Sequence, residues 1–481
     1  MLLKIAAQYA VPVSIPPIAA AAHRSTAEAG VSVLTSGGSA VDAGVAMMLV
    51  SCSSEALFTG LCGGGFATVY SAATRTVRCV DFFVAVPGLD GRVPGPATPI
   101  EVSFVGQQVP YAIGSASVAV HGLPAGARYL WERWGRLGWS EVVAPSIRAA
   151  RGTPFPQTHA DLLVNVAAAM CVGEGAGVFR RPDGSFLRGT DQLFHPDGPA
   201  GFELLARDPG AFYRGEFAEA LLCVTADTGA ISQQDLDAYQ VVEREPATAQ
   251  LTDHDGRVVT AFGRGNDLDD VLATLSTAGR TVTADPQLDA DAARALAAAL
   301  RKPDRRAETT NLIAVDDRGD ACVITTSLGL GAGVWVPGYG AHLNSMLGEG
   351  ELVREGTAVG DRMGSMMSPL VVLDDDGGLL LAAGAAGGSR IRPALVQVVL
   401  RMLSGVHPQA AINAPRLVAL PGLVRLEPGF AEPVIEGLRS AGEDVRVADA
   451  LAPYFGGVSA VSRLGGGADP RRSGAAIPVD G

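Results

Sequence analysis

The sequence predicts an α+β fold, with helices in the first two thirds of the chain and short paired strands in the last third. The 481 residues are 48% hydrophobic and 18% charged, which is typical of a globular protein with a large core. Helical periods recur before Arg305, whereas the apolar residues after it gather into short runs split by turns.

Two helices and a strand pair are expected near the N-terminus. Apolar residues recur at helical spacing over residues 25–34, and the glycines at 37–38 supply the stop. Residues 40–50 are apolar almost all round, which indicates a helix buried between layers. The glycine-rich bend that follows leads into two strands over residues 59–83. The bend, GLCGGGF, lacks the Lys-Ser/Thr of a phosphate loop, so we interpret it as structural.

Three further helices are expected in the middle of the chain. Residues 125–137 form an amphipathic pattern, and residues 214–228 also have a helical period. A capping box opens the third helix over residues 232–239, since Ser232 is followed three residues later by Asp235.

The last third is predicted to contain two hairpins. Residues 309–328 are two β-rich runs joined by DDRGD, and residues 368–384 repeat the design around DDDGG. The charged stretch 286–306 before them is interpreted as an exposed helix that leads into a loop. A loop in front of a buried strand is where we expect a processing site.

The net charge of −13 argues against a nucleic-acid or anionic-membrane partner and favours a small-molecule substrate. No apolar run of eighteen residues predicts a membrane span. Prolines interrupt the apolar residues 1–20, so we interpret them as part of the protein rather than as a signal peptide, and we expect a cytoplasmic location.

Cysteine and histidine spacing predicts neither a metal site nor a cofactor. The histidines form no HxH or HxxxH pair, and single ones such as His121 and His342 are expected to be structural. The six cysteines are scattered and are expected to be reduced thiols: Cys52, Cys62, Cys79, Cys171, Cys223 and Cys322.

Several of these segments, read in order, resemble the γ-glutamyltransferase family. The similarity runs from about residue 19 to about residue 447. The segments that carry it include STAEAGVSVLTSGGSAVDAGVA, TGLCGGGFATVYSAATRTVRCVDF, DPGAFYRGEFAEALL, TTNLIAVDDRGD, VWVPGYGAHLNSM, GAAGGSRIRPALVQVVL and NAPRL. Because they occur in one order, together they are more specific than any single motif.

The resemblance implies a four-layer αββα sandwich of the N-terminal-nucleophile hydrolases. It also implies a precursor that cuts itself between Glu308 and Thr309. A large subunit of residues 1–308 and a small subunit of residues 309–481 would then stay together as one αββα unit.

The resemblance makes Thr309 the catalytic nucleophile. A threonine hydroxyl needs a base, and cutting before Thr309 creates one, because a free α-amine has a pKa near 7.7–8.0. Gly387 and Gly388 match the family's oxyanion glycines, where backbone N–H groups approach closely. Ser327 falls where the family has a threonine that hydrogen-bonds the nucleophile.

The sequence departs from the family where the γ-glutamyl group is held. Phe83 replaces the arginine that binds the α-carboxylate, and the family's paired serines become Ser365 and Met366. Gly348 aligns with the acid that binds the α-amino group, in the segment LNSMLGE, whose Asn344 is expected to bind the substrate. Two amides of the pocket are replaced by Gly329 and Ser345, and Asn311 stands where the family usually has histidine.

Three functions remain open at this stage. The first is an amidase or acyltransferase that forms an acyl-enzyme on a substrate other than γ-glutamyl compounds. A sharper version is similar to family members in actinomycete pathways to 4-alkyl-proline units, which hydrolyse a carbon–carbon bond. The second is a genuine glutathione hydrolase or γ-glutamyltransferase, and the third is an uncut, non-catalytic binding protein.

Overall fold

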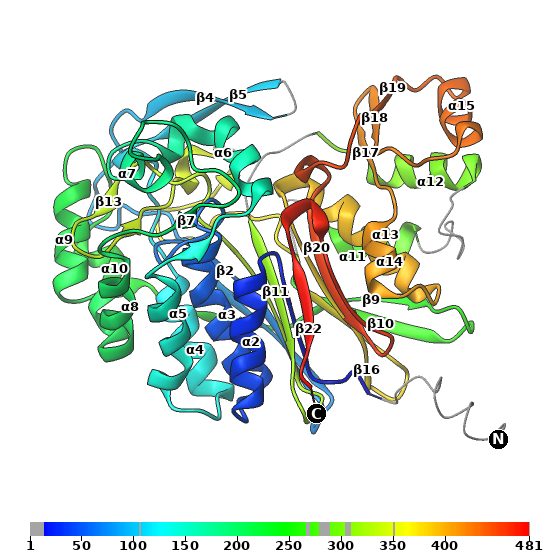
Figure 1. Cartoon of the computed structure of the whole chain (residues 1–481), viewed down its shortest axis with the longest axis horizontal. Helices are drawn as coiled ribbons and strands as arrows, with labels where there is room; N and C mark the ends of the chain where they lie inside the picture. Colours follow the sequence, from blue (N-terminus) through cyan, green and yellow to red (C-terminus); the bar gives the residue numbers. More distant parts are fainter. Residues whose placement is uncertain are drawn as a thin grey trace.

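Two antiparallel sheets lie face to face at the centre of the molecule, and helices cover the outer face of each (Figure 1). The structure is a computed structural model that describes residues 14–104, 107–265, 270–278, 289–303, 309–349 and 352–480. The four layers confirm the expected αββα sandwich.

The first sheet combines strands from before and after Thr309. Its order is β22-β1-β11-β12-β2-β3-β8. The strands are β22 (Ala475–Pro478), β1 (Ile18–Ala21), β11 (Thr310–Val315), β12 (Ala321–Ser327), β2 (Gly64–Ser71), β3 (Thr76–Phe82) and β8 (Val242–Arg244).

The second sheet has the order β21-β20-β16-β15-β10-β9 and faces the first through β16 and β20. The strands are β21 (Gly465–Ala468), β20 (Gly457–Ser462), β16 (Leu379–Ala386), β15 (Leu370–Leu373), β10 (Val258–Gly263) and β9 (Ala247–Thr252). The β11–β12 and β15–β16 hairpins confirm the two predicted from the turns DDRGD and DDDGG.

One helical layer packs on the first sheet. Its central helix, α3, contacts β11 and β12 and is almost entirely buried, as its all-round apolar sequence predicted. A capping box between Ser39 and Asp42 starts this helix. The layer comprises α2 (Arg24–Thr35), α3 (Ala40–Ser54), α4 (Leu123–Trp134), α5 (Trp139–Ala149) and α8 (Gly198–Arg207).

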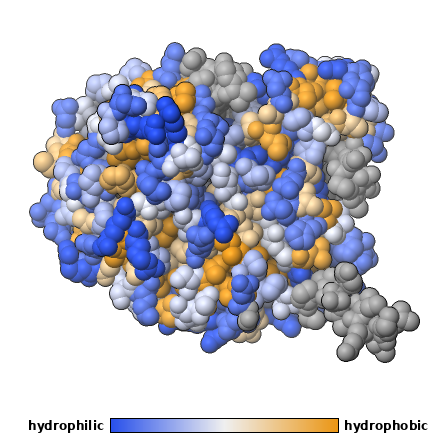
Figure 2. Space-filling view, in the orientation of Figure 1, coloured by the Kyte–Doolittle hydropathy of each residue, from blue (hydrophilic) through white to orange (hydrophobic). Residues whose placement is uncertain are grey.

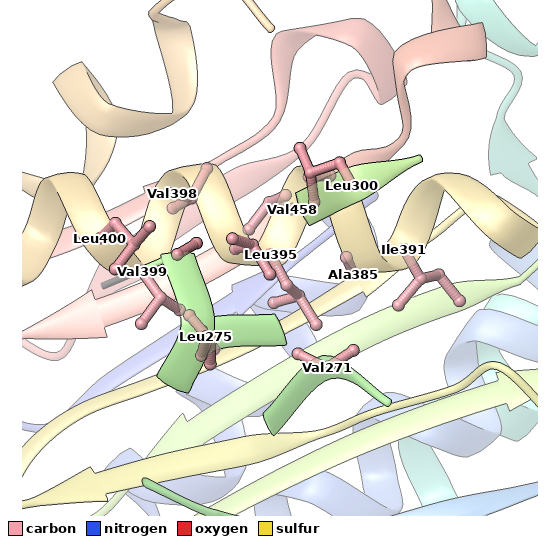
Figure 3. Close-up of a cluster of buried hydrophobic side chains, with 14 of the residues drawn as sticks. Val271, Leu275, Leu300, Ala385, Ile391, Leu395, Val398, Val399, Leu400 and Val458 are labelled. Atoms are coloured by element: carbon pink, nitrogen blue, oxygen red, sulfur yellow. The ribbon is translucent and has the colours of Figure 1, made fainter. Parts of the chain in front are cut away.

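The other helical layer packs on the second sheet. Every residue of its central helix, α13, is buried. Figure 3 shows Leu395 and Val399 of this helix near Leu275, with Val458 of the sheet close by. The layer comprises α11 (Val271–Ala278), α12 (Ala290–Leu300), α13 (Ile391–Leu403) and α14 (Pro408–Asn413).

The remaining elements flank the sandwich. The helix predicted over residues 232–239 has its capping box, whereas the helix expected to be exposed over residues 286–306 buries one face through Leu296 and Leu300. These elements are β4 (Thr98–Phe104), β5 (Gln107–Ile113), β6 (Thr153–Pro154), α6 (Gln157–Met170), α7 (Gly175–Phe179), β7 (Gln192–Leu193), α9 (Glu216–Thr225), α10 (Gln233–Ala238), β13 (Trp335–Val336), β14 (Ala341–His342), β17 (Leu417–Leu420), β18 (Leu423–Leu426), α15 (Glu432–Ser440) and β19 (Val445–Val447).

The visible surface mixes hydrophilic residues with small hydrophobic patches (Figure 2). Within the described ranges, no helix has both the length and the apolar character that a membrane crossing requires.

Truncating Leu395 tests the core of the second helical layer. Leu395 is fully buried, so Leu395→Ala should lower the free energy of unfolding by about 2–5 kcal/mol, because it leaves a cavity. Val164 on α6 is 60% exposed, and Val164→Ala should change it by less than about 0.5 kcal/mol. Urea titrations followed by circular dichroism measure both, and equal losses would contradict the packing described.

Candidate active site

A small cavity lies where the start of β11, the end of β12 and the turn before α13 meet. It collects side chains that are far apart in the sequence. Six of the predicted site residues are among those that line it. The lining residues are Phe83, Thr309, Ser327, Met346, Glu349, Leu352, Ser365, Met366, Met367, Gly388 and Ile391.

The strand geometry distinguishes the two adjacent threonines. Thr309 immediately precedes β11, is 1% exposed and lines the cavity. Successive side chains of a strand point to opposite faces. Thr310 accordingly turns to the helical side, where its hydroxyl donates a hydrogen bond to the Glu55 carboxylate. Thr309 is therefore the threonine whose hydroxyl can meet a ligand in the cavity.

Ser327 ends β12 beside Thr309. The antiparallel register pairs Thr310 with Thr326, so the next pair along the ladder is Thr309 with Ser327. Ser327 lines the cavity, and its Oγ accepts a hydrogen bond from the Gly329 N–H at 3.1 Å. The serine predicted to assist the nucleophile is thus brought next to it.

Gly387 and Gly388 form the turn between β16 and α13. Their φ angles are +120° and +61°, which favour glycine. A Cβ at Gly387 would lie 3.2 Å from the Gly456 Cα, so this turn is also tightly packed. Of the two glycines predicted to form the oxyanion site, Gly388 is among the residues that line the cavity and Gly387 is not.

Most of the remaining cavity wall is apolar. Phe83 follows β3 and packs against Phe66, with ring centroids 5.3 Å apart. Met366 lies in the same wall and is 4% exposed. Where the family has an arginine and a second serine, this cavity therefore offers hydrocarbon surface, with the Ser365 hydroxyl beside it.

An acid lies next to the position where the sequence predicted that the family's acid is lost. A Cβ at Gly348 would lie 1.9 Å from the Ala112 carbonyl oxygen, so this position packs against backbone. The carboxylate of the next residue, Glu349, lines the cavity. The cavity therefore contains a carboxylate that the sequence interpretation did not include.

Tyr111 orients the Glu349 carboxylate and was missed in the sequence. Its hydroxyl donates to Glu349 Oε1 at 2.7 Å, lies 2.9 Å from Ser345 Oγ and accepts from the Leu330 N–H. Burial and the neighbouring carboxylate raise the pKa of Tyr111 well above its usual range, so it remains a donor. No short motif marks this residue, because the β4–β5 hairpin brings it in from a distant segment.

Three predicted substrate-binding residues lie behind the cavity. Ser345 is fully buried and bonds Tyr111. A Cβ at Gly329 would come within 2.9 Å of Glu349 Oε1 and 2.8 Å of Ser345 Oγ, so glycine leaves room for these groups. Asn344 accepts from the backbone of Ala119 and donates to carbonyls around it, which gives its amide a structural use.

Arg264 supports the wall from behind and was also missed. Its guanidinium donates to the carbonyl oxygens of Ser365 and Met367 at 3.2 and 3.4 Å. It stacks 3.9 Å above the Phe66 ring. Burial lowers the pKa of Arg264 to about 10, so it stays a cation at neutral pH.

Asn311 joins the two sheets below the nucleophile. Its Oδ1 accepts a hydrogen bond from the Thr325 hydroxyl at 3.0 Å. A Cβ at Gly384 of β16 would lie 1.8 Å from the same Oδ1. The asparagine that replaces the family's usual histidine therefore occupies the space that Gly384 leaves open.

Among the described residues, no group of three or more His, Cys, Asp or Glu could hold a metal ion. All six cysteines are free. Burial lowers the pKa of His121 to about 4 and that of His342 to about 3, which makes both neutral core residues.

Glu308 and the bond to be cut lie outside the described residues, so the processing site and the subunit boundary remain predictions.

Replacing Gly384 with alanine tests the contact between the sheets. Gly384→Ala should lower the unfolding free energy by about 1–3 kcal/mol, because the new methyl group overlaps Asn311. The same change in an Asn311→Ala background should cost less, since the overlap is gone. Denaturant titrations of the four proteins measure this coupling, and strictly additive losses would show that the two residues do not touch.

Comparison with known proteins identifies the family. The family model described as Gamma-glutamyltranspeptidase matches residues 26–266 and 268–479. The Acylase ACY 1 proenzyme of Pseudomonas sp. (strain V22) is 26% identical and aligns over 95% of this chain and 93% of its own length. The Glutathione hydrolase proenzyme of Bacillus subtilis (strain 168) is 29% identical over 47% of this chain, but over only 38% of its own length.

Solved structures show the same fold over nearly the whole chain. A cephalosporin acylase from Bacillus halodurans has a TM-score of 0.78 at 20% identity and covers 97% of this chain and 96% of its own. LmbA2991HD has a TM-score of 0.76 at 18% identity, with 96% and 98% covered. The chain belongs to the γ-glutamyltranspeptidase family, and it is an enzyme of the N-terminal-nucleophile hydrolase and acyltransferase class.

Proposed function

We propose that the chain cuts itself before Thr309 and then acts as an acylase, with Thr309 as nucleophile, on amides whose acyl group is largely apolar. The observation that carries the proposal is the convergence of Thr309, Ser327 and Gly388 on one cavity with Phe83 and Met366 in its wall.

Self-cleavage needs no cofactor in this scheme. The Thr309 Oγ attacks the Glu308 carbonyl carbon, the peptide becomes an ester, and water releases the new N-terminus. The freed α-amine has an ordinary pKa near 7.7–8.0, so part of it is neutral at pH 8 and can accept a proton.

In each turnover the amine takes the proton of the Thr309 hydroxyl as Oγ attacks the substrate carbonyl. The oxygen of the tetrahedral intermediate carries the negative charge, and backbone N–H groups of the Gly387–Gly388 turn would stabilise it. The proton then passes to the leaving amine, and an ester remains on Thr309. Water, or an amine acceptor, resolves that ester and regenerates the enzyme.

Ser327 assists by position. It lies next to Thr309 in the ladder, and its hydroxyl can donate to the nucleophile's oxygen as the family's threonine does. Because the serine keeps that donor, the change from threonine is compatible with catalysis.

The cavity retains one end of the γ-glutamyl recognition and lacks the other. Glu349 supplies a carboxylate that could bind a cationic or hydroxyl group, whereas Phe83 and Met366 supply no cation for a carboxylate. An unpaired buried charge typically costs 2–5 kcal/mol. A γ-glutamyl α-carboxylate should therefore bind poorly, and an apolar or aromatic acyl group should fit better.

The relatives are consistent with both an acylase and a glutathione hydrolase. The Pseudomonas acylase aligns over 95% of this chain, and the Glutathione hydrolase proenzyme 2 of Schizosaccharomyces pombe aligns over 86% of it. Glutathione hydrolysis remains the second candidate because Glu349 is in place at the amino-recognition end. Carbon–carbon bond hydrolysis in secondary metabolism is a third, finer version, and oxalate release from an unsaturated pyrroline dicarboxylate would support it.

Intact-mass spectrometry tests the nucleophile. The wild-type protein should give two fragments with the break before Thr309, and Thr309→Ser should also be cut because it keeps the hydroxyl. Thr309→Ala should remain one folded chain. A wild-type chain that stays uncut would overturn the proposal and favour the non-catalytic binding protein.

A pair of chromogenic amides tests the substrate class. The cut enzyme should hydrolyse a phenylacetyl p-nitroanilide with a kcat/KM about 100-fold above that for γ-glutamyl p-nitroanilide, because the carboxylate of the latter finds no cation. Thr309→Ala provides the blank. A preference for the γ-glutamyl compound would establish the second candidate and show that Phe83 does not exclude it.

A further inference from the structure

Glu55 is a fully buried carboxylate directly beneath the nucleophile's strand. It caps the C-terminal end of α3 and has no exposed surface. Its Oε1 accepts a hydrogen bond from the Thr26 hydroxyl at 2.8 Å, and its Oε2 accepts one from the Thr310 hydroxyl. The mechanism above does not use this group.

The pKa of the Glu55 carboxylate is set mainly by its burial. Burial raises the pKa of Glu55 to about 7, while the hydroxyls of Thr310 and Thr26 and the charge of Arg472 lower it. Arg472 is 2% exposed and stacks 4.7 Å above the Phe58 ring.

The other titratable groups nearby carry no charge near neutral pH. Burial lowers the pKa of His23 and takes that of His159 well below its usual range. Burial also raises the pKa of the Cys52 thiol above its usual range. Glu55 is therefore the group of this set whose charge changes near pH 7.

Glu55 and Arg472 lie next to the two parts of the proposed catalytic centre, the strand of Thr309 and the glycine turn. Thr310 is the residue next to Thr309, so a hydrogen bond that holds the Thr310 side chain also limits the movement of the Thr309 backbone. On the other side, a Cβ at Gly387 would lie 3.5 Å from an Arg472 guanidinium nitrogen. The pair of charges thus lies behind the nucleophile's strand and behind the oxyanion turn.

We propose that Glu55 is a positioning residue: its ionised carboxylate holds the Thr310 hydroxyl and thereby fixes Thr309 for self-cleavage. The inference rests on the proposed role of Thr309. A displacement of about 1 Å at a reacting atom can cost about 100-fold in rate, so a hold on the adjacent residue is sufficient to matter.

Ionisation controls how many hydroxyls Glu55 can accept. The ionised carboxylate accepts from Thr310 and Thr26 with one oxygen each. A protonated carboxyl donates through one oxygen, so one of the two hydroxyls must rotate to accept, and that hydrogen bond is no longer assisted by charge. Before the cut, the Thr309 nitrogen is an amide and cannot titrate. The pH dependence of self-cleavage near neutrality therefore reports on Glu55 and not on the terminal amine.

Refolding measures this dependence. Uncut precursors of wild type, Glu55→Gln, Thr310→Ser and Thr310→Val, collected as unfolded protein in urea, are refolded into buffers from about pH 5.5 to 9, and the cut fraction is followed by gel with time. Wild-type cleavage should accelerate through about pH 7, where Glu55 ionises. Glu55→Gln should lose this rise and run about tenfold slower at pH 8.5, since a neutral hydrogen bond replaces a charged one.

The threonine pair is the matched control. Thr310→Ser keeps the hydroxyl and should follow the wild type, whereas Thr310→Val should be slow and without the rise. Circular dichroism beside the uncut Thr309→Ala protein shows which variants fold. If Glu55→Gln fails to fold, the comparison of Thr310→Ser with Thr310→Val decides whether the Thr310 hydroxyl is needed for fast self-cleavage.

Thermal melts of uncut proteins give an independent readout. Glu55 has a raised pKa in the folded state, so the stability it contributes is present below its ordinary pKa near 4.5 and is lost as pH rises through about 7. In a Thr309→Ala background, Glu55→Gln should therefore gain melting temperature relative to its parent between pH 5 and 8.

Two negative outcomes are distinguishable. A cut wild type with an equally fast Glu55→Gln of the same pH profile overturns the role of Glu55 and leaves Thr309 in place. A wild type that is uncut at every pH overturns the proposed function itself.

Discussion

The close contact of β11 with β16 is the constraint on which the rest of the site depends. Asn311 of one sheet reaches so near to the other that the facing residue must be Gly384. That contact fixes the distance between the strand that begins after Thr309 and the strand that ends at the Gly387–Gly388 turn. Thr309 and the glycine turn are therefore held by the packing of the two sheets rather than by a mobile loop.

The sheet order also explains how two fragments would remain one protein. In the first sheet, β11 pairs with β1 on one side and with β12 on the other, and β12 pairs with β2. Strands from before and after Thr309 thus share backbone hydrogen bonds across the sheet. A single cut before Thr309 leaves those ladders intact, and the large fragment still contributes Phe83 to the cavity.

Local patterns predicted the helices and hairpins that carry a clear period or turn. The all-apolar α3, the capping box at Ser232 and the β11–β12 hairpin are examples. Contacts between distant segments have no such signal. Tyr111, Glu55 and Arg264 act through partners more than 100 residues away, so a pass along the chain could not find them.

The candidate site divides in the same way. Thr309, Ser327, Gly388, Phe83 and Met366 were predicted from the resemblance, and the fold brings them to one cavity. The alignment placed Gly348 where the family has its acid and so predicted that this acid is lost, whereas the carboxylate of the next residue, Glu349, lines the cavity. A shift of one residue in an alignment is enough to change an inferred pocket, because neighbouring side chains on a turn point to different surroundings.

Covalent trapping of the nucleophile tests the central claim most directly. The cut enzyme would be quenched in acid during turnover of a slow phenylacetyl ester, and its fragments would be digested and sequenced by tandem mass spectrometry. The account predicts a phenylacetyl mass increment on a peptide whose first residue is Thr309, with a fragment series that places the group on that residue. An acyl group found on another residue, such as Ser327, would contradict it.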